Sequence, residues 1–396
     1  MAAQRFKPVK KAGLFAYIPR RVRLDNNAMT ALDLAFTGDL VLDEPQPDHW
    51  LSGIAPATRA AHVTIGHLEV PHTAGGDELP GDVPAPGADP AHLAALQRAG
   101  FDAVTLAGNH MADCGARGIA DTRAELERLG LACSGAGANL ERARQPALLR
   151  SAGRRIAILS YNCVGPENGW ATPTAAGCAY VRVHTRDGAP VAPTADLQDP
   201  DPGSLSAMQT DIAVAAAAGG LVVVALHKGL VHTPARLAPY ERPLARAAID
   251  AGAHVVIGHH AHLIRGIEFH RGRPIFHGLG NGCVVTRALS PGQDHPARAA
   301  WVEKRKRLFG FEPDPAYWLA PFHPDAVHAM LGRIRWHEDG RIETGFVPVY
   351  VEAPGRPVIA TGAQAAAVCA YVARITLEAG MPPLTLSADA DMVLAA

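Results

Sequence analysis

The stretch Leu221–His262 reads LVVVALHKGLVHTPARLAPYERPLARAAIDAGAHVVIGHHAH and decides the fold class. Residues 221–226 form a continuous apolar run, typical of a buried strand, that ends at His227. Residues 243–251 have the pattern of a helix, and residues 254–257 form a second apolar strand followed by a Gly-His-His block. A strand, a helix and a strand in this order favour an α/β fold with a parallel sheet.

The same alternation continues through the chain, and polar residues follow most of the predicted strands. Open α/β sheets bind their ligands beyond the carboxyl ends of the strands, so these polar residues are expected to converge on one site. The other strands are predicted at residues 31–37, 61–65, 103–107 and 156–161, and the other helices at residues 90–99, 119–129, 205–218 and 364–380.

The composition excludes several classes of protein. Of the 396 residues 48% are hydrophobic and 19% are charged, which indicates a large core and not a disordered chain. The 37 Lys and Arg residues balance 38 Asp and Glu residues, which disfavours binding to nucleic acid or to an anionic membrane surface. The six cysteines have no C-x-x-C spacing, so neither a zinc ribbon nor a disulfide framework is indicated. We therefore expect a cytoplasmic protein.

One large domain is predicted over residues 31–355, after an N-terminal extension at residues 1–30. Residues 286–326 mix prolines, a basic run and aromatic residues, and we interpret them as a lid-like segment inserted over the site. Two strands joined by an Asp-Gly turn form a predicted hairpin near the end of this domain. Residues 356–396 are expected to form a C-terminal helix and tail.

Histidine is the unusual component of this sequence. Eight of the 19 histidines fall between His227 and His277, and imidazole is the commonest metal ligand. Carboxylate, amide and imidazole groups follow the predicted strands, a set that suits Mn, Fe, Zn, Ni or Co better than Ca. The candidates in chain order are Asp39, Glu69, Asn109, His110, His227, His260 and His262.

Five short blocks, in this order, resemble the CapA family of poly-γ-glutamate capsule proteins, which is related to the calcineurin-like metallophosphoesterases. The resemblance extends from about residue 33 to about residue 285, and weakly to residue 351. It implies a four-layer αββα sandwich, in which two sheets face each other and helices cover both outer faces. The blocks are TGDLVL (37–42), GHLEVP (66–71), AGNHMADCG (107–115), ALHKG (225–229) and IGHHAHLIRGIEFHRGRPIFHGLGN (257–281).

The resemblance also implies one or two divalent metal ions at the strand ends, with Glu69 as the carboxylate that bridges two metals. His110 would be the general acid that protonates the leaving group, and Asp113 would orient its imidazole. The metal ligands that the resemblance implies are Asp39, Glu69, Asn109, His227, His260 and His262.

This chain departs from the family pattern near the site. The superfamily's first motif is Asp-x-His, but Val41 stands where that motif has its histidine, so one ligand of the first metal is missing. The second block often reads Asn-Leu-Glu, and the fourth often contains a glutamate that is absent from this chain. These changes favour a different substrate, which Lys228 would hold as a point charge. The candidates for binding it are His67, Lys228, His232 and His259.

These observations predict a metal-dependent hydrolase. A metal-activated hydroxide would attack a phosphoester, an ester or an amide of a small-molecule or peptide-like substrate that is expected to be anionic. The same site would also support epimerisation at a peptide Cα, with a histidine as the base. A third interpretation, from another class, is a noncatalytic protein that handles polyglutamate or capsule polymer.

Overall fold

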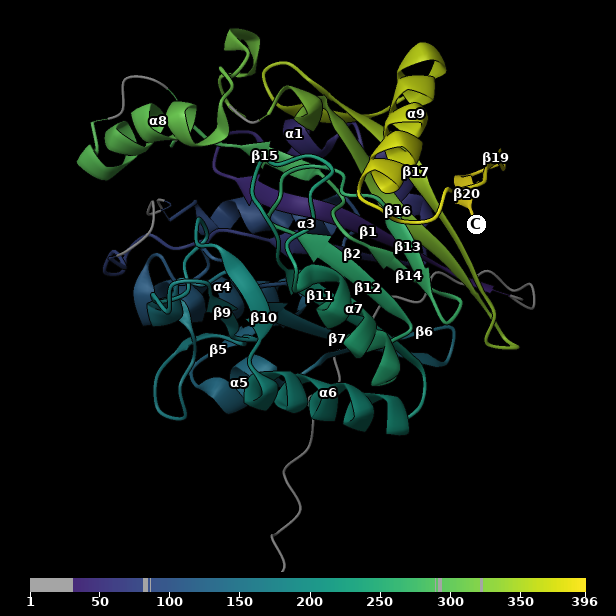
Figure 1. Ribbon diagram of the computed structural model, residues 1–396, viewed down its shortest axis with the longest axis horizontal. Helices are drawn as coiled ribbons and strands as arrows, with labels where there is room; N and C mark the ends of the chain where they lie inside the picture. The colour runs from purple at the N-terminus through teal and green to yellow at the C-terminus, as the bar shows by residue number, and fades with distance from the viewer. Residues whose placement is uncertain (1–30, 81–84, 86, 289, 291–293, 321–322) are drawn as a thin grey trace, which may run out of the picture.

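The computed structural model describes residues 31–80, 85, 87–288, 290, 294–320 and 323–396, and the predicted extension at residues 1–30 lies outside this part. The described residues form two large β-sheets that pack face to face, with helices on their outer sides (Figure 1). None of the described helices has both the length and the apolar character that crossing a membrane requires.

The first sheet has ten strands and is built around β1 (Ala31–Leu42). The first half of β1 pairs antiparallel with β16 (His328–His337), and its second half pairs in parallel with β15 (Asn281–Val285). On its other side β1 pairs in parallel with β2 (Val63–Leu68). The other strands are β3 (Ala103–Thr105), β4 (Ala132–Ser134), β17 (Ile342–Glu352), β18 (Arg356–Ile359), β19 (Leu386–Ala388) and β20 (Val393–Ala395).

This change of partner along β1 corrects the predicted end of the strand. The sequence pattern placed the end at residue 37, but β1 continues to Leu42 because β15 supplies new backbone partners. Gly38 is required where the partners change, since a Cβ at this position would lie 1.8 Å from the carbonyl oxygen of Gly280. Asp39 is therefore held within a strand and not in a loop that follows it.

The second sheet has six strands in the order β13–β14–β12–β11–β7–β6. The two strands predicted from the opening stretch are β11 and β12, which pair in parallel and place His227 opposite His259. The strands are β6 (Ala147–Ser151), β7 (Arg154–Asn162), β11 (Leu221–His227), β12 (Val255–His259), β13 (Ile267–His270) and β14 (Arg273–Phe276). Two small sheets pair β5 (Ala136–Gly137) with β8 (Gly177–Cys178) and β9 (Val183–Thr185) with β10 (Leu197–Pro200).

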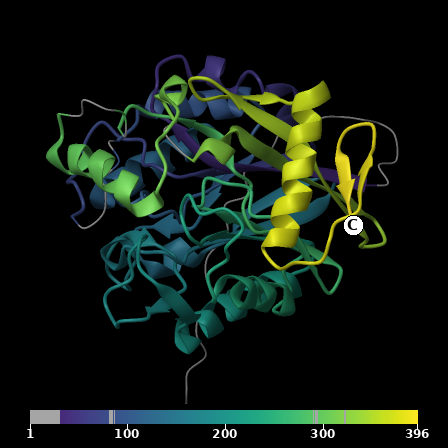
Figure 2. The ribbon, with the colours of Figure 1, turned by 45° about the horizontal axis from the view of Figure 1, so that its top comes forward.

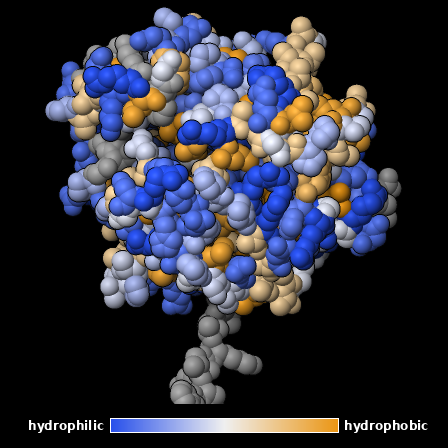
Figure 3. All heavy atoms as spheres, viewed as in Figure 1, coloured by the Kyte–Doolittle hydropathy of each residue, from blue (hydrophilic) through white to orange (hydrophobic). Residues whose placement is uncertain are grey.

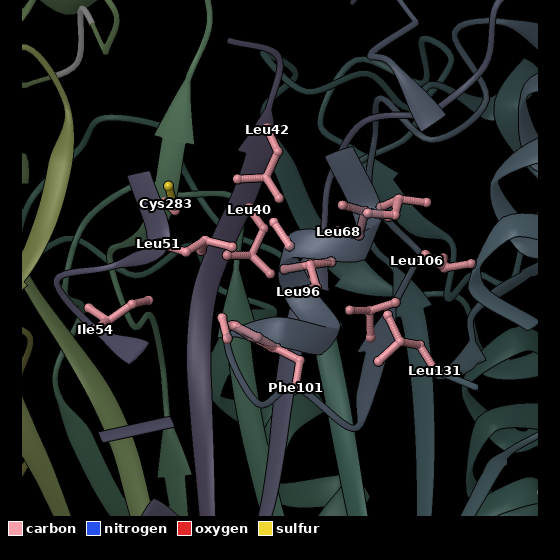
Figure 4. Close-up of a cluster of buried hydrophobic side chains, with 14 of the residues drawn as sticks. Leu40, Leu42, Leu51, Ile54, Leu68, Leu96, Phe101, Leu106, Leu131 and Cys283 are labelled. Atoms are coloured by element: carbon pink, nitrogen blue, oxygen red, sulfur yellow. The ribbon is translucent and has the colours of Figure 1, made fainter. Parts of the chain in front are cut away.

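Three apolar layers hold the sheets and helices together. Between the sheets, Phe36 of the first sheet belongs to the same buried cluster as Ile257 of the second. On the outer face of the first sheet, Leu40 and Leu68 point toward Leu96 of a covering helix (Figure 4). On the outer face of the second sheet, strand side chains pack against α6 (Pro202–Ala217) and α7 (Glu241–Asp250). Figure 1 shows both helices on this side of the sheet. This arrangement confirms the predicted αββα sandwich.

The helices cover both outer faces and one end of the sandwich. Figures 1 and 2 both show α9 beside the hairpin of β16 and β17, and α8 at the opposite end of the molecule. The face seen in Figure 1 is mainly hydrophilic, with apolar residues gathered at α9 (Figure 3). The helices are α1 (Pro47–Leu51), α2 (Ala55–Ala60), α3 (Ala94–Arg98), α4 (Gly115–Arg128), α5 (Leu140–Arg144), α6 (Pro202–Ala217), α7 (Glu241–Asp250), α8 (Pro296–Phe309) and α9 (Gly362–Glu378).

Candidate metal centre

The six residues predicted as metal ligands meet at the carboxyl-end edge shared by the two sheets. The first sheet contributes the oxygen ligands, from β1, from the residue after β2 and from the loop after β3. The second sheet contributes the imidazoles, from the last residue of β11 and from the loop after β12. All six side chains are buried, and they are Asp39, Glu69, Asn109, His227, His260 and His262.

One group of ligand atoms surrounds His262. Ligand atoms of Asp39, Glu69 and His262 all lie within 4.8 Å of one another. Nε2 of His262 is 3.4 Å from Oε1 of Glu69, and Nδ1 is 3.7 Å from Oδ2 of Asp39. Two carboxylates and an imidazole at this spacing form a set that can hold a divalent transition metal.

A second group adjoins the first around His227. Its Nε2 lies 2.7 Å from Oδ1 of Asn109 and 3.1 Å from Nδ1 of His260. Ligand atoms of Asp39, His67 and His227 also lie within 4.8 Å of one another. The described residues therefore contain two adjacent groups of ligand atoms that share Asp39.

The backbone of the loop after β12 is bent into an uncommon conformation. His260 and His262 have φ angles of 88° and 55°, in the left-handed region that residues with a Cβ rarely adopt. This bend lets the backbone N–H of His260 donate to both carboxylate oxygens of Asp39, at 3.3 and 3.4 Å. Strain of this kind is found where the surrounding structure holds a functional site in place.

The charges of the first group are in conflict without a cation. Burial and the negative charge of Glu69 raise the pKa of Asp39 to about 8. Burial also opposes ionisation of Glu69, but the positive charge of His262 outweighs it and lowers the pKa of Glu69 to about 2. The two buried carboxyls thus oppose each other's ionisation, and a divalent cation between them would let both ionise.

Several buried polar atoms in this cluster fit a metal ion. Among the described residues, Oε2 of Glu69, Nδ1 of His227 and Nε2 of His260 have no hydrogen-bond partner. Buried polar atoms are normally paired, so several unpaired ones on the ligand residues need an explanation. Burial keeps the pKa of His227 well below its usual value and lowers that of His260 to about 3, so both imidazoles are neutral, the form that binds metals. The donor set therefore fits the metal that the sequence predicted.

The predicted acid and its orienting carboxylate are also in contact. Nδ1 of His110 lies 2.7 Å from Oδ2 of Asp113, and the His110 side chain is 23% exposed. The same Asp113 oxygen accepts a hydrogen bond from the backbone N–H of Ala85. His110 is close enough to Glu69 that its charge helps to lower the pKa of that carboxyl. His110 therefore lies between the cluster and solvent.

The structure corrects the expectation that Lys228 holds an anionic group of the substrate. Its side chain is 0% exposed, and Nζ forms a 2.8 Å ion pair with Glu241, which is also 0% exposed. Nζ also donates to the carbonyl oxygen of His277, at 3.3 Å. Lys228 is thus part of a buried charge network and is closed to a substrate.

Two of the other predicted substrate contacts are buried as well. Nε2 of His259 lies 3.1 Å from the carbonyl oxygen of Thr37, and its ring stacks on that of His67 at 4.4 Å. His67 is 0% exposed. The expectation that these two rings touch substrate does not fit these positions, because neither ring has a surface open to a bound molecule.

His232 lies beside the cluster and is 7% exposed. Its ring centroid lies 5.6 Å from that of His262 and 5.9 Å from that of Phe311, which belongs to the predicted inserted segment. Residues of the same segment, including Tyr317 and His323, line a cavity of about 70 Å³ together with Asn281. The segment therefore lies next to the cluster.

Sequence reasoning missed two residues that hold imidazoles of the site, one next to the predicted ligand His262 and one next to the predicted substrate contact His67. Asn281, at the start of β15, lies opposite Asp39 in the sheet, and its Oδ1 is 3.0 Å from Nδ1 of His262. Thr105, in β3, lies 2.9 Å from Nδ1 of His67. The Gly-Asn pair at the end of the last of the five blocks was an available signal for Asn281, whereas nothing in the sequence around Thr105 distinguishes it from other strand residues.

Comparison with known proteins shows similarity to capsule proteins. The chain is 28% identical over 187 residues to the capsule biosynthesis protein CapA of Bacillus anthracis, covering 47% of this chain and 41% of that protein. It is 27% identical over 259 residues to the PGA biosynthesis protein CapA of Bacillus subtilis, covering 63% of this chain and 62% of that protein. Each match thus spans less than two thirds of the relative's length.

A solved structure and a family model complete the comparison. A putative 5'-nucleotidase from Staphylococcus aureus, in complex with alpha-ketoglutarate, aligns over 86% of this chain and 58% of its own at 11% identity, with a TM-score of 0.39. Residues 33–284, well over half of the chain, match the family described as bacterial capsule synthesis protein PGA_cap. This region contains all six predicted ligands and confirms the resemblance seen in the sequence. The chain therefore belongs to the PGA_cap family of bacterial capsule synthesis proteins.

Proposed function

We propose that this protein is a metal-dependent hydrolase of a small anionic phosphoester, ester or amide. One observation carries the proposal: oxygen ligands from one sheet and imidazoles from the other meet in a buried cluster. Within the described chain some of their ligand atoms have no hydrogen-bond partner. Burying so many ionisable groups is costly, and a packed core does not need them. A bound cation explains the cost.

The residues of the cluster divide into two tasks. Asp39, Glu69 and the imidazoles would hold one or two divalent ions, which supply Lewis acidity and make water more acidic. His110 would give a proton to the leaving group, because it lies at the outer side of the cluster. Asp113 would hold the imidazole through Nδ1, leaving the far side of the ring directed away from that carboxylate.

Metal analysis and a substrate panel test the proposal. Purified protein is expected to contain at least one transition metal ion, and removal of the metal should abolish hydrolysis of the reactive member of a panel of phosphoesters, esters and amides. His110→Asn should lower kcat by about 100-fold or more, as expected for loss of a general acid. His184→Asn, at an exposed histidine far from the cluster in sequence, is the control. A metal-free protein that retains activity would contradict the proposal.

The names of the relatives favour a second candidate, a noncatalytic role in handling a capsule polymer such as polyglutamate. That role predicts tight binding of polyglutamate with no turnover of any member of the panel. Incubation of a peptide substrate in deuterium oxide adds a third outcome, because deuterium at Cα without bond cleavage indicates epimerisation. The hydrolase proposal requires a cleaved product instead.

A further inference from the structure

We infer that His67 is a metal ligand of this centre, through Nε2, and not a substrate-binding residue. The inference rests on the proposed function, because it requires that the centre binds metal. It adds to the six predicted ligands an imidazole from the first sheet, which otherwise contributes only oxygen atoms.

The pairing of β1 with β2 places His67 beside the predicted ligands. In the parallel register Asp39 lies opposite His67, and the next pair along is Leu40 opposite Leu68. Neighbouring residues of a strand point to opposite faces. Since Leu40 and Leu68 enter the apolar cluster under the covering helices, Asp39 and His67 face the other way, toward the second sheet.

A hydrogen-bond chain determines which nitrogen of His67 carries the proton. The hydroxyl of Thr105 donates to the carbonyl oxygen of Gly66 at 3.3 Å, so its oxygen accepts from Nδ1–H of His67 at 2.9 Å. Nε2 then carries a lone pair and no hydrogen. A second nitrogen held in this way is the usual means of fixing the tautomer of a ligating histidine.

Nε2 is the nitrogen of His67 that is left for the ligand cluster, because Thr105 occupies Nδ1. Among the described residues Nε2 of His67 is buried and has no hydrogen-bond partner, and ligand atoms of His67, Asp39 and His227 lie within 4.8 Å of one another. Atoms that share an ion at about 2.1 Å lie about 3 to 4 Å apart, so a small movement brings the three onto one ion. The ring is stacked on His259 at 4.4 Å and lies 4.8 Å from the ring of His227, which restricts its rotation.

Val41 shows why the neighbouring strand supplies the imidazole. It lies two residues after Asp39 on β1, and its side chain packs in an apolar cluster with Val70, Leu263 and Val284. This position of β1 therefore contributes no ligand atom. His67, opposite Asp39, is the residue of the adjacent strand that reaches the same face of the sheet.

The test is a titration of metal-free protein with Co²⁺, followed by calorimetry and by the visible absorption of the bound ion. His67→Asn keeps an amide at the position of Nδ1, which preserves the contact with Thr105, and removes Nε2. Loss of a residue that only orients a ligand lowers metal affinity by about 10- to 100-fold. His67→Asn removes a direct ligand, so we expect it to weaken Co²⁺ binding by about 100-fold or more and to change the visible spectrum of the bound ion. Thr105→Val should weaken binding by about 10- to 100-fold without removing a ligand.

His72→Asn is the matched control. His72 is equally buried, its Nδ1 lies 3.3 Å from the carbonyl oxygen of Val70, and its Nε2 also has no partner in the described part of the chain. It does not belong to either group of ligand atoms, so Co²⁺ affinity and spectrum should be unchanged. If His67→Asn does not fold, Thr105→Val decides the question by the same two measurements.

The outcomes separate this inference from the proposed function. Wild-type protein that binds no Co²⁺ or other transition metal overturns both. Wild-type protein that binds Co²⁺, together with His67→Asn or Thr105→Val protein of unchanged affinity and spectrum, overturns the inference alone and leaves the hydrolase proposal standing. Weaker binding with a changed spectrum in His67→Asn, and wild-type behaviour in His72→Asn, supports it.

Discussion

Replacing Lys228 by methionine tests whether the buried charge network stabilises the fold. Nζ of Lys228 lies 2.8 Å from Oε2 of Glu241, and neither side chain is exposed. Removing one partner of a buried ion pair costs about 3–5 kcal/mol, because the remaining charge is left in a medium that solvates it poorly. In Lys228→Met, Glu241 keeps the backbone N–H of Ala238 at 2.7 Å and the guanidinium of Arg265 at 3.4 Å. We therefore expect the lower end of that range, a loss of about 3 kcal/mol in the free energy of unfolding.

Urea denaturation of metal-free protein, followed by circular dichroism, measures this loss. The double variant Lys228→Met/Glu241→Gln should be less destabilised than the sum of the two single variants, by about 1–3 kcal/mol, because it leaves no unpaired charge between these two positions. Arg374→Met removes an exposed 3.0 Å pair with Glu378 and should cost less than about 1 kcal/mol. The reasoning is refuted if Lys228→Met unfolds at the wild-type urea concentration, or if the two single effects simply add.

Three further outcomes are expected. Burial opposes ionisation of Glu241, but the charges of Lys228 and Arg265 outweigh it and lower the pKa of this carboxyl from 4.5 to about 2. The ionised carboxylate therefore stabilises the fold fully above pH 4.5, and this stabilisation is lost as the pH falls toward 2. Urea midpoints measured between pH 6 and pH 3 should decline more in wild type than in Glu241→Gln. Asn281→Leu removes the partner of Nδ1 of His262 and should weaken Co²⁺ binding by about 10- to 100-fold in the same titration, and unchanged affinity would exclude an orienting role. Gly38→Ala should destabilise the protein by about 3 kcal/mol in thermal unfolding, because the new Cβ would overlap the Gly280 carbonyl oxygen. Gly203→Ala is the control: its Cβ would have a side-chain oxygen at 3.3 Å as its nearest neighbour, and its stability should stay within about 1 kcal/mol of wild type.

The sequence predicted the meeting of polar residues at the strand ends for one physical reason, whereas the four layers and the metal-ligand set were implied by the resemblance to the CapA family. The carboxyl ends of parallel strands lie at one edge of a sheet, so a polar residue after each apolar run is brought to the same place. His227, the last residue of β11, follows this rule, and Asp39 reaches the same place from within β1, although the two belong to different sheets. The end of β1 could not be predicted, because the strand is prolonged by pairing with β15, which comes much later in the chain.

The roles of His67 and Lys228 could not be predicted, because they depend on neighbours in space. A pattern of apolar and polar residues shows that His67 lies near a strand end, but its partners Asp39 and Thr105 come from the strands on either side. Lys228 directly follows a predicted ligand, and its burial is determined by Glu241 on α7. Periodicity within one segment contains no information about either contact.

The ligand cluster is better explained by chemistry than by stability. Buried ion pairs can often be replaced by apolar side chains with no loss of stability, so packing does not require carboxylates and imidazoles at this junction. Their presence buries Asp39, whose pKa is raised by that burial, and requires a left-handed backbone at His260 and His262. The sheets that hold them are joined by an apolar core, so the ligands are brought together before any ion arrives. A site whose geometry is imposed by the fold in this way would select its ion and orient it, which is what the proposed hydrolytic centre requires.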